Sequence, residues 1–364
     1  MYPVREKGIP MKAKSRCLFY SGLLLGLLAL PQVQLKAQSA PGYKITGKIP
    51  IGGDGGWDYT IVDSDARRLY ASHATRTVVL DVDQGKIVGE IPNTEGVHGI
   101  ALAPELGRGF TSNGRADTVT VFDLKTFKVL DTIKVSGTDP DCITYDPVSK
   151  RVFTFNGHSA NATVINAATG VVLATIPLGS KPEFAQADGK GHIFNNLEDT
   201  SELVEIDTEK LALMNRWPLK PCESPSGMAI DREHGHLFIG CHNKMMAIAD
   251  TGTGKIVATV PIGEGVDANA FDPGTGLAYS SNGGSGTLTV VKEESPDKFT
   301  VLEEAPTEPR ARTMAIDLKT HIVYLPIAQF GPPPAPTADN PHPRPSIVSG
   351  TFALLVATPA HLGM

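Results

Sequence analysis

Ionisable and polar side chains recur in this sequence at intervals of 40 to 45 residues, a spacing that would bring them together in a repeat protein. The seven residues, which we call the channel ring, are Asp58, His98, Asp141, Glu183, Ser226, Asp267 and Arg312. Carboxylates and imidazoles are the oxygen and nitrogen donors that divalent cations use in proteins. If these positions converge, the chemistry open to them is binding of a cation or a small polar ligand, or metal-assisted hydrolysis.

The candidate metal ligands within the channel ring are Asp58, His98, Glu183 and Asp267. Carboxylates that lie close together raise one another's pKa unless a bound cation or Arg312 compensates their charge. The structural alternative is that polar residues at the starts of the inner strands satisfy free backbone amides beside a channel that holds only water. The sequence leaves both interpretations open.

A second set of positions, where the second strand of each repeat ends, is predicted to lie on the same face. This second ring comprises His73, Asn113, Asn156, Leu197, Cys241, Asn282 and Ile327. Each of its asparagines precedes a glycine, a strong turn signal because both residue types tolerate positive φ. His73 departs from the pattern, and either adds an imidazole near His98 or is a hydrogen-bonded structural residue.

Three cysteines follow residue 39: Cys142, Cys222 and Cys241. In an oxidising compartment an odd number permits one disulfide and leaves one free thiol. Cys222 and Cys241 fall on the same face of one repeat, so they are the predicted pair; a soft-metal site of Cys241, His242 and Met245 is the alternative. The CxxC, HExxH, CxxCH and GxSxG motifs are absent from the sequence, which argues against a structural zinc site, a zincin, a c-type haem and a nucleophile elbow.

These positions belong to a repeat of about 42 residues whose anchor is an aspartate that ends one strand and opens a turn. The anchors are Asp63, Asp146, Asp188, Asp231, Asp272 and Asp317, with Ala103 in the one remaining repeat. Each repeat carries four short strands, of which the second bears an aromatic residue, as in 151–156, and the third is rich in β-branched residues, as in 118–123. Four short strands bounded by Gly and Asp turns are typical of a propeller blade, whereas a helical repeat would show a 3.6-residue apolar period.

Seven repeats predict an all-β, seven-bladed β-propeller with four-stranded antiparallel blades. The seventh repeat runs out of chain after its third strand, at 352–356, whereas residues 43–50 near the N-terminus match the fourth strands of other repeats. We therefore predict that the N-terminal strand pairs into the last blade and closes the ring, which removes the exposed sheet edges of an open array.

Several second strands, of which 108–113 and 277–282 are examples, share an aromatic residue, a small or β-branched residue, Thr or Ser, and then Asn. With the glycine that follows many fourth strands, this pattern resembles the exported bacterial YVTN-repeat, YncE-like β-propellers over residues 43–358. The resemblance implies a binding or interaction module without a catalytic motif. Related seven-bladed folds include lactonases and non-catalytic subunits of quinoprotein dehydrogenases, so a metal-assisted lactonase-like hydrolase and a partner of a periplasmic electron-transfer system are the alternatives.

One segment interrupts the last repeat: residues 331–346 are rich in proline and lie between its second and third strands. Prolines favour extended polyproline II conformations. By register this insert emerges on the face of the two rings, where it forms a partial lid, docks a partner protein or is a solvated loop.

Residues 1–39 have the order of a secretory signal peptide: basic Lys12, Lys14 and Arg16, an apolar run at 18–30, and small Ala37 and Ser39. The apolar run is shorter than the about 20 residues of a membrane-spanning helix. The sequence thus predicts a signal peptide at 1–39 and a single exported propeller at 40–364, periplasmic or secreted.

Charge restricts the partners of this propeller. Beyond residue 39 the chain has 27 lysines and arginines against 38 aspartates and glutamates, which disfavours sequence-independent binding to nucleic acid. The expected partners are a small molecule, an ion or an exported protein, and the expected state is a monomer. No cofactor is indicated beyond a divalent cation at the channel ring.

Overall fold

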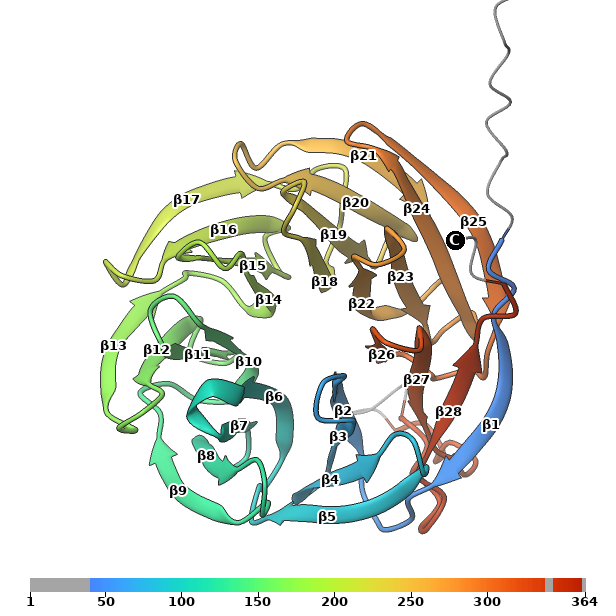
Figure 1. Cartoon of the computed structure of the whole chain (residues 1–364), viewed down its shortest axis with the longest axis horizontal. Coiled ribbons are helices and arrows are strands. Elements are labelled where there is room, and N and C mark those ends of the chain that lie inside the picture. The colour runs from blue at the N-terminus through green and yellow to red at the C-terminus, as the bar shows by residue number, and fades with distance from the viewer. Residues whose placement is uncertain (1–39, 338–342, 362–364) are drawn as a thin grey trace, which may run out of the picture. The chain divides into compact units, whose positions relative to one another are not determined.

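The structure, a computed structural model, describes residues 40–337 and 343–361. These residues form seven four-stranded antiparallel sheets around a central channel, which is a seven-bladed β-propeller (Figure 1). In each blade the first strand lies beside the channel and the fourth lies at the outer rim. The fold predicted from the repeat is confirmed. The signal peptide predicted at 1–39 lies outside the described residues.

Blades one to three follow the order of the sequence. Blade one comprises β2 (Trp57–Asp63), β3 (Arg68–His73), β4 (Arg76–Asp81) and β5 (Lys86–Pro92). Blade two comprises β6 (Val97–Ala103), β7 (Arg108–Asn113), β8 (Thr118–Asp123) and β9 (Val129–Lys134), with a short 3-10 turn, η1 (Pro104–Leu106), after β6. Blade three comprises β10 (Pro140–Asp146), β11 (Arg151–Asn156), β12 (Asn161–Asn166) and β13 (Val172–Pro177).

Blades four to six repeat this pattern. Blade four comprises β14 (Pro182–Ala187), β15 (His192–Leu197), β16 (Glu202–Asp207) and β17 (Ala212–Pro218). Blade five comprises β18 (Pro225–Asp231), β19 (His236–Cys241), β20 (Met245–Asp250) and β21 (Ile256–Pro261). Blade six comprises β22 (Val266–Asp272), β23 (Leu277–Asn282) and the longer strands β24 (Thr287–Ser295) and β25 (Lys298–Pro306).

Blade seven joins the two ends of the propeller. It comprises β26 (Ala315–Asp317), β27 (Ile322–Ile327), β28 (Ala353–Thr358) and, as its outer strand, β1 (Lys44–Pro50). β1 runs antiparallel to β28. This pairing confirms the predicted closure, and it covers the edge of β28 that would otherwise be exposed.

The residues before β1 also hold the closure against blade six. Tyr43 is 2% exposed, and its hydroxyl donates to the backbone oxygen of His321 at 2.7 Å and hydrogen bonds with Tyr279 Oη. The backbone amides of Gly42 and Tyr43 donate to the carboxylate of Glu303. The N-terminal segment is therefore tied to two blades.

The core lies between neighbouring blades and uses the aromatic residue that each second strand provides. These buried aromatics are Tyr70, Phe110, Phe153, Phe194, Phe238, Tyr279 and Tyr324. Tyr70, for example, packs with Ile100 and Phe122 of blade two. Full burial of such a side chain contributes about 2–3 kcal/mol, so the blades form a stiff support for the residues around the channel.

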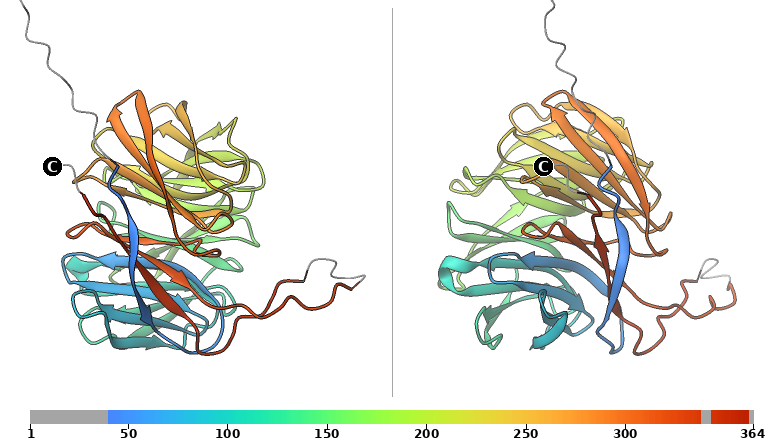
Figure 2. Two further views of the ribbon diagram at one scale, coloured as in Figure 1. Left: turned by 90° about the vertical axis from the view of Figure 1, so that its right-hand side faces the viewer. Right: turned by 45° about the vertical axis from the view of Figure 1, so that its right-hand side comes forward.

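The proline-rich insert lies between β27 and β28, as predicted. Phe330 and Ile347 pair at its base, and the amide of Gly331 donates to the backbone oxygen of Ser346. The described arms of the insert run out from the body of the propeller in both views of Figure 2. In the part of the chain that the structure describes, no helix is long and apolar enough to cross a membrane.

Candidate functional site

A β-bulge directs the channel-ring side chains in each of the first six blades. In blade one, Trp57 lies opposite His73 and Thr60 lies opposite Ala71, so the register between β2 and β3 shifts around Asp58. Equivalent shifts occur at the starts of β6, β10, β14, β18 and β22. A bulge interrupts the regular alternation of side chains and re-aims the residue within it. These bulges were not predicted from the sequence.

The ring side chains converge as predicted from their spacing. A cavity of about 150 Å³ in the channel is lined by Asp58, Asp141, Glu183, Asp267 and Arg312, together with Tyr59 and Phe184. His98 Nδ1 lies 2.6 Å from Asp58 Oδ2, and Ser226 Oγ donates to Asp267 Oδ1 at 2.9 Å. The structure thus brings all seven residues of the channel ring together.

Side chains of the second strands hold the backbone of this ring from the neighbouring blade. Ser112 Oγ donates to the backbone oxygen of Asp141, and Ser281 Oγ donates to that of Arg312 at 2.6 Å. Both serines directly precede an asparagine of the second ring. The Ser-Asn ending of the second-strand motif therefore has a physical role in positioning the channel ring.

Arg312 compensates two of the ring carboxylates. Its guanidinium contacts Asp267 Oδ2 and lies 3.5 Å from Asp58 Oδ1, and it donates to the backbone oxygen of Trp57 at 3.1 Å. Arg312 was predicted to offset the charge of the ring acids, and its contacts agree with that role.

His98 is the second cation of the ring. Its Nδ1 lies 3.7 Å from Asp141 Oδ1 in addition to its close contact with Asp58. Burial lowers the pKa of His98, but the hydrogen bond to Asp58 and the charges of Asp141 and Asp58 outweigh burial and raise this pKa to about 9. The imidazolium at neutral pH therefore stabilises two carboxylates at once.

The third cation, Lys181, was missed by the sequence analysis. Its Nζ lies 2.6 Å from Glu183 Oε1 and 2.5 Å from Glu198 Oε2. Burial and the neighbouring charge of Asp141 nevertheless raise the pKa of Glu183, and burial and the charge of Asp58 raise the pKa of Asp141. Arg312, His98 and Lys181 thus face the four ring carboxylates and Glu198, so more of the negative charge at the mouth is compensated than Arg312 alone would compensate.

The four predicted metal ligands do not form one donor cluster. Asp58 and His98 lie with Asp141 in a group whose donor atoms are within 4.8 Å of one another. Glu183 pairs instead with Lys181 and Asp267 with Arg312. If the ring holds a metal ion, Asp141 replaces Glu183 and Asp267 among the ligands.

The asparagines of the second ring have structural contacts. Asn113 Nδ2 donates to Thr118 and Thr120, and Asn282 Nδ2 makes the equivalent bonds to Thr287 and Thr289. Asn156 likewise bonds to residues of the third strand of its blade. These bonds join the second strand to the third within a blade.

Turns follow the Asn-Gly pairs as predicted, but neither residue of any pair has a positive φ. The left-handed residue of each turn is the one directly before the third strand, for example Asp117 and Gly286. The glycines after the asparagines serve close packing instead: a Cβ at Gly283 would lie 2.7 Å from Arg312 Cβ, and a Cβ at Gly114 would lie 2.8 Å from the imidazole of His98. They make room for the channel ring.

His73, Leu197 and Ile327 are buried packing residues of the second ring. The ring of His73 stacks on Phe352 with the centroids 4.3 Å apart, and burial lowers the pKa of His73 to about 4. His73 is therefore neutral at physiological pH and packs against blade seven. The structural role considered for it is the one that its contacts support, although its ring nitrogens lack the hydrogen-bond partner expected with that role.

A disulfide joins Cys222 to Cys241, the pair favoured by the sequence. The bond occupies the sulfur that a soft-metal site with His242 and Met245 would require. Cys142 is a free, buried cysteine that packs in the core between blades three and four.

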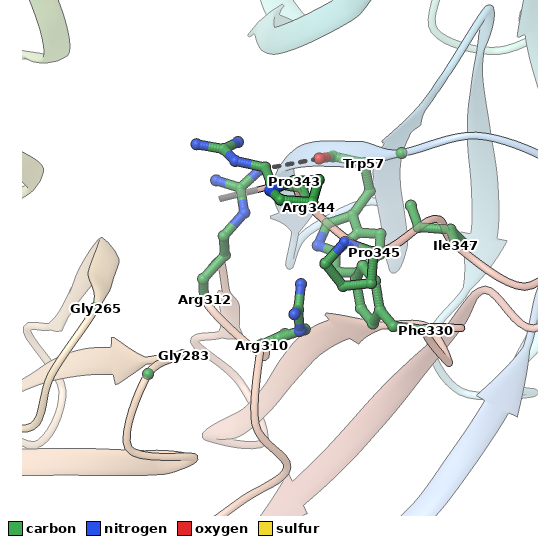
Figure 3. Close-up of a pocket in the computed structure, with 12 residues that line it drawn as sticks. Trp57, Gly265, Gly283, Arg310, Arg312, Phe330, Pro343, Arg344, Pro345 and Ile347 are labelled. Carbon is green, nitrogen blue, oxygen red and sulfur yellow. Dashed lines mark hydrogen bonds between the residues drawn. The ribbon is translucent and has the colours of Figure 1, made fainter. Parts of the chain in front are cut away.

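A further cavity lies beside the channel ring and shares Arg312 with it, where blades one, six and seven meet the base of the insert. It has a volume of about 700 Å³. Figure 3 shows Arg310 and Arg312 on one side of this outer cavity and Phe330 and Ile347 on the other. The remaining lining residues are Gly56, Trp57, Gly265, Gly283, Gly284, Pro343, Arg344 and Pro345.

The apolar wall of the outer cavity is built from stacked rings. Trp57 stacks on Phe352, with the centroids 5.5 Å apart, and lies 6.0 Å from Phe330. The guanidinium of Arg310 lies 4.1 Å from the centroid of Phe330. Trp57 is 8% exposed, and its indole Nε1 is buried without a hydrogen-bond partner. Among the residues that line the outer cavity, only Arg312 was predicted from the sequence, because the others come together through ring closure and the insert.

A second cavity of about 520 Å³ adjoins the first and shares Gly56, Trp57 and Arg312 with it. Its lining mixes charges, with Arg115, His98 and His158 beside Asp58, Asp117 and Asp139. The two cavities together extend from the channel ring to the insert.

Comparison with known proteins identifies the fold alone. No family model and no curated protein matches the chain. Hydrazine synthase of Kuenenia stuttgartiensis matches with 15% identity and a TM-score of 0.65, over 81% of this chain and 95% of that chain. U3-55K and the WD40 repeats of RRP9 match with 11% identity and TM-scores of 0.70 and 0.71, each over 88% of this chain and 99% of the other. At such identities the likeness is one of propeller architecture.

Proposed function

We propose that this chain is an exported β-propeller that binds a small anionic molecule with a flat apolar part in the outer cavity. The observation that carries the proposal is the lining, which combines three arginines with an aromatic and aliphatic wall and contains no carboxylate. Concave, largely apolar pockets with a few convergent polar groups are the usual form of small-molecule sites.

The charge of the outer cavity is available to a ligand. Arg312 is engaged by the ring carboxylates, but neither Arg310 nor Arg344 has a carboxylate partner among residues 40–337 and 343–361. A guanidinium presents several N–H donors in one plane and binds carboxylate, sulfonate or phosphate groups through two parallel hydrogen bonds. The indole ring of Trp57, whose N–H is buried without a partner, lies in the wall beside them.

Export and the binding role are parts of the same proposal. The signal-peptide pattern of residues 1–39 supports export to the periplasm or the medium. The second-strand motif supports kinship with the YVTN-repeat, YncE-like propellers, and hence a role in binding rather than catalysis. The ligand is expected to reach the cavity from the face that carries the insert.

A second candidate function is metal-assisted hydrolysis at the channel ring. One observation favours it: Asp58, His98 and Asp141 offer donor atoms within 4.8 Å of one another. Binding of a metal ion there requires loss of the His98 proton that now stabilises both carboxylates. Elemental analysis of protein purified without chelators tests this candidate. One metal ion per chain in the wild type that is lost in H98A supports it, and the absence of such an ion in the wild type removes it.

The binding proposal is tested with anilinonaphthalene sulfonate and its uncharged analogue phenylnaphthylamine, whose emission rises on binding. The sulfonate should bind the wild-type protein more tightly than the neutral analogue. In the double variant R310Q/R344Q its affinity should fall about 10- to 100-fold, because each of the two lost hydrogen bonds contributes about 0.7–1.4 kcal/mol at a partly exposed site. The neutral probe should be nearly unaffected.

The matched control is R115Q, which removes an arginine from the adjoining cavity. It should leave the sulfonate affinity within about twofold of wild type. Equal affinity of the two probes for the wild-type protein, or equal losses in R310Q/R344Q and R115Q, would contradict the assignment of the outer cavity.

A further inference from the structure

A separate group of side chains of metal-binding type lies at the C-terminal end of β18 in blade five, at the opposite end of this strand from the channel ring. Asp231 and His234 come from the end of β18 and the turn that follows, and Glu293 comes from β24 of blade six. Their donor atoms lie within 4.8 Å of one another. They line a cavity of about 50 Å³ between the two blades, and neither the channel ring nor the outer cavity includes any of them.

Glu293 distinguishes this group from the equivalent positions of the other blades. It occupies the first position after the regular third strand, where its amide donates to the backbone oxygen of Gly276. The same backbone bond identifies the equivalent residues of other blades, which are Val82, Leu124, Ala167, Thr208 and Thr251. The fold accepts an apolar or hydroxyl side chain at this position, so the carboxylate of Glu293 is not required by the architecture.

The carboxylate of Glu293 is buried, and only one of its two oxygens has a hydrogen-bond partner. Glu293 is 9% exposed, and its Oε1 accepts from His236 Nδ1 at 2.8 Å. Its other oxygen, Oε2, is buried without a hydrogen-bond partner. Asp231, a second buried carboxylate at 3% exposure, lines the same small cavity. Burial of an incompletely paired carboxylate is unfavourable, so the free oxygen of Glu293 beside the charge of Asp231 favours binding of a cation.

We propose that Asp231, His234 and Glu293 bind a divalent transition-metal ion, with zinc as the reference ion, that joins blade five to blade six. One imidazole and two carboxylates are ligands that zinc accepts, and a set of three protein ligands leaves a fourth position for water. An imidazole ligand disfavours calcium and magnesium, which prefer oxygen donors.

The distances between donors require little adjustment. His234 Nδ1 lies 2.6 Å from Asp231 Oδ2 and 3.5 Å from Glu293 Oε1. In a tetrahedral zinc site with bonds of about 2.0–2.2 Å, donors lie about 3.4 Å apart. The side chain of His234 is 47% exposed, so it can move outward and the ion can enter from solvent.

His236 is a positioning residue in this site. It is 3% exposed, and its hydrogen bond fixes one oxygen of Glu293 while the other stays free. Hydrogen-bond partners of this kind orient the ligands of metal sites. Asp231 is fixed in a similar way, because its Oδ1 accepts from the backbone amides of Glu233 and His234 and its Oδ2 faces the His234 imidazole.

The test is the binding of zinc chloride to the purified, chelator-stripped protein, measured by calorimetry and by the rise in unfolding temperature, with cobalt(II) absorption as a spectroscopic readout. Wild type should bind one ion at this site. H234A and E293Q should each raise the dissociation constant at least tenfold and abolish the temperature rise and the cobalt bands. E293Q without metal should be at least as stable as wild type without metal, because it removes a buried charge beside Asp231, so its loss of binding cannot be ascribed to misfolding.

Two variants serve as controls. H192A alters the Asp188–His192 pair of blade four, whose imidazole occupies the position of His236, and H98A alters the donor group of the channel ring. Both should retain zinc binding to the blade-five site. Absence of zinc binding in wild type, or loss of all binding in H98A with retention in H234A, would overturn the proposal. Probe binding at the outer cavity is measured without metal, so the two proposals fail independently.

Discussion

Replacement of Arg312 by glutamine should destabilise the propeller by about 2 kcal/mol. Loss of one partner from a buried ion pair costs about 3–5 kcal/mol, whereas exposed pairs contribute about 0–1 kcal/mol. The Arg312 side chain is 40% exposed, but Asp58 and Asp267 are 17% and 22% exposed, so the expected loss lies between these ranges. An unfolding entropy of about 0.7 kcal/mol per kelvin, from about 2.1 cal/mol per kelvin per residue, converts this loss to about 3 °C.

The assay is urea denaturation of wild type, R312Q, D267N and the double variant, with far-ultraviolet circular dichroism as the signal. Because D267N removes one of the charges that R312Q leaves uncompensated, the double variant should be less destabilised than the sum of the single variants, by about 1 kcal/mol. K48Q, which breaks the exposed Lys48–Glu308 pair, is the control and should change stability by less than about 0.5 kcal/mol. Equal effects of R312Q and K48Q, or strict additivity in the cycle, would refute the charge compensation of the ring.

Three further predictions concern closure, the disulfide and pH. In urea denaturation, Y43A should lower the free energy of unfolding by about 3–5 kcal/mol, because it removes a buried ring at the closure. Y43F should lower it by about 1 kcal/mol, because it removes only the hydrogen bonds of the hydroxyl group. Equal stability of wild type and Y43A would contradict the role of Tyr43 in the closure. Reduction of Cys222–Cys241, whose cysteines are 19 residues apart, should cost about 3 kcal/mol, and the C222S/C241S variant should not respond to reductant. The pKa of His98 is about 6.5 in the unfolded chain and about 9 in the folded protein, so the stabilisation by its positive charge is present below pH 6.5 and is lost as the pH rises to 9. Between these pH values the urea midpoint of H98Q should therefore vary less than that of wild type. The same pH profile in both proteins would exclude the raised pKa.

The architecture could be predicted because each blade repeats the same local rules. A strand-ending aspartate such as Asp146 accepts from the amides of the turn that follows it, and an aromatic residue such as Phe153 fills the space between blades. These requirements recur with every blade and therefore appear in the sequence as a period. The N-terminal strand was recognisable for the same reason, since it matches the fourth strands that other blades already contain.

The residues of the channel ring could be predicted from the sequence, but the charge state of the ring could not. Its members share one register position, whereas Lys181 lies in the preceding loop and has no counterpart that would signal its role. The register shifts that aim Asp58 and its equivalents depend on pairing between strands, which single residues do not encode. A lysine two residues before a ring carboxylate is the signal that would have identified the third cation.

The outer cavity was beyond prediction because it has no periodicity. Trp57 and Phe352 meet only through closure of the ring, and Phe330, Arg310 and Arg344 meet only because the insert returns to the propeller. Glu293 was missed for a related reason: it lies in a lengthened hairpin of blade six and contacts residues of blade five. Contacts that arise once per molecule leave no repeated pattern in the sequence.

The most direct test of the binding proposal is the indole resonance of Trp57 in a proton–nitrogen correlation spectrum. The chain has two tryptophans, so W217F leaves Trp57 as the single indole signal. Addition of anilinonaphthalene sulfonate should shift this resonance in a saturable manner, and in R310Q/R344Q the titration should require about 10- to 100-fold more probe. An indole resonance that stays in place while the probe binds elsewhere, or a titration that is the same in both backgrounds, would contradict the proposed site.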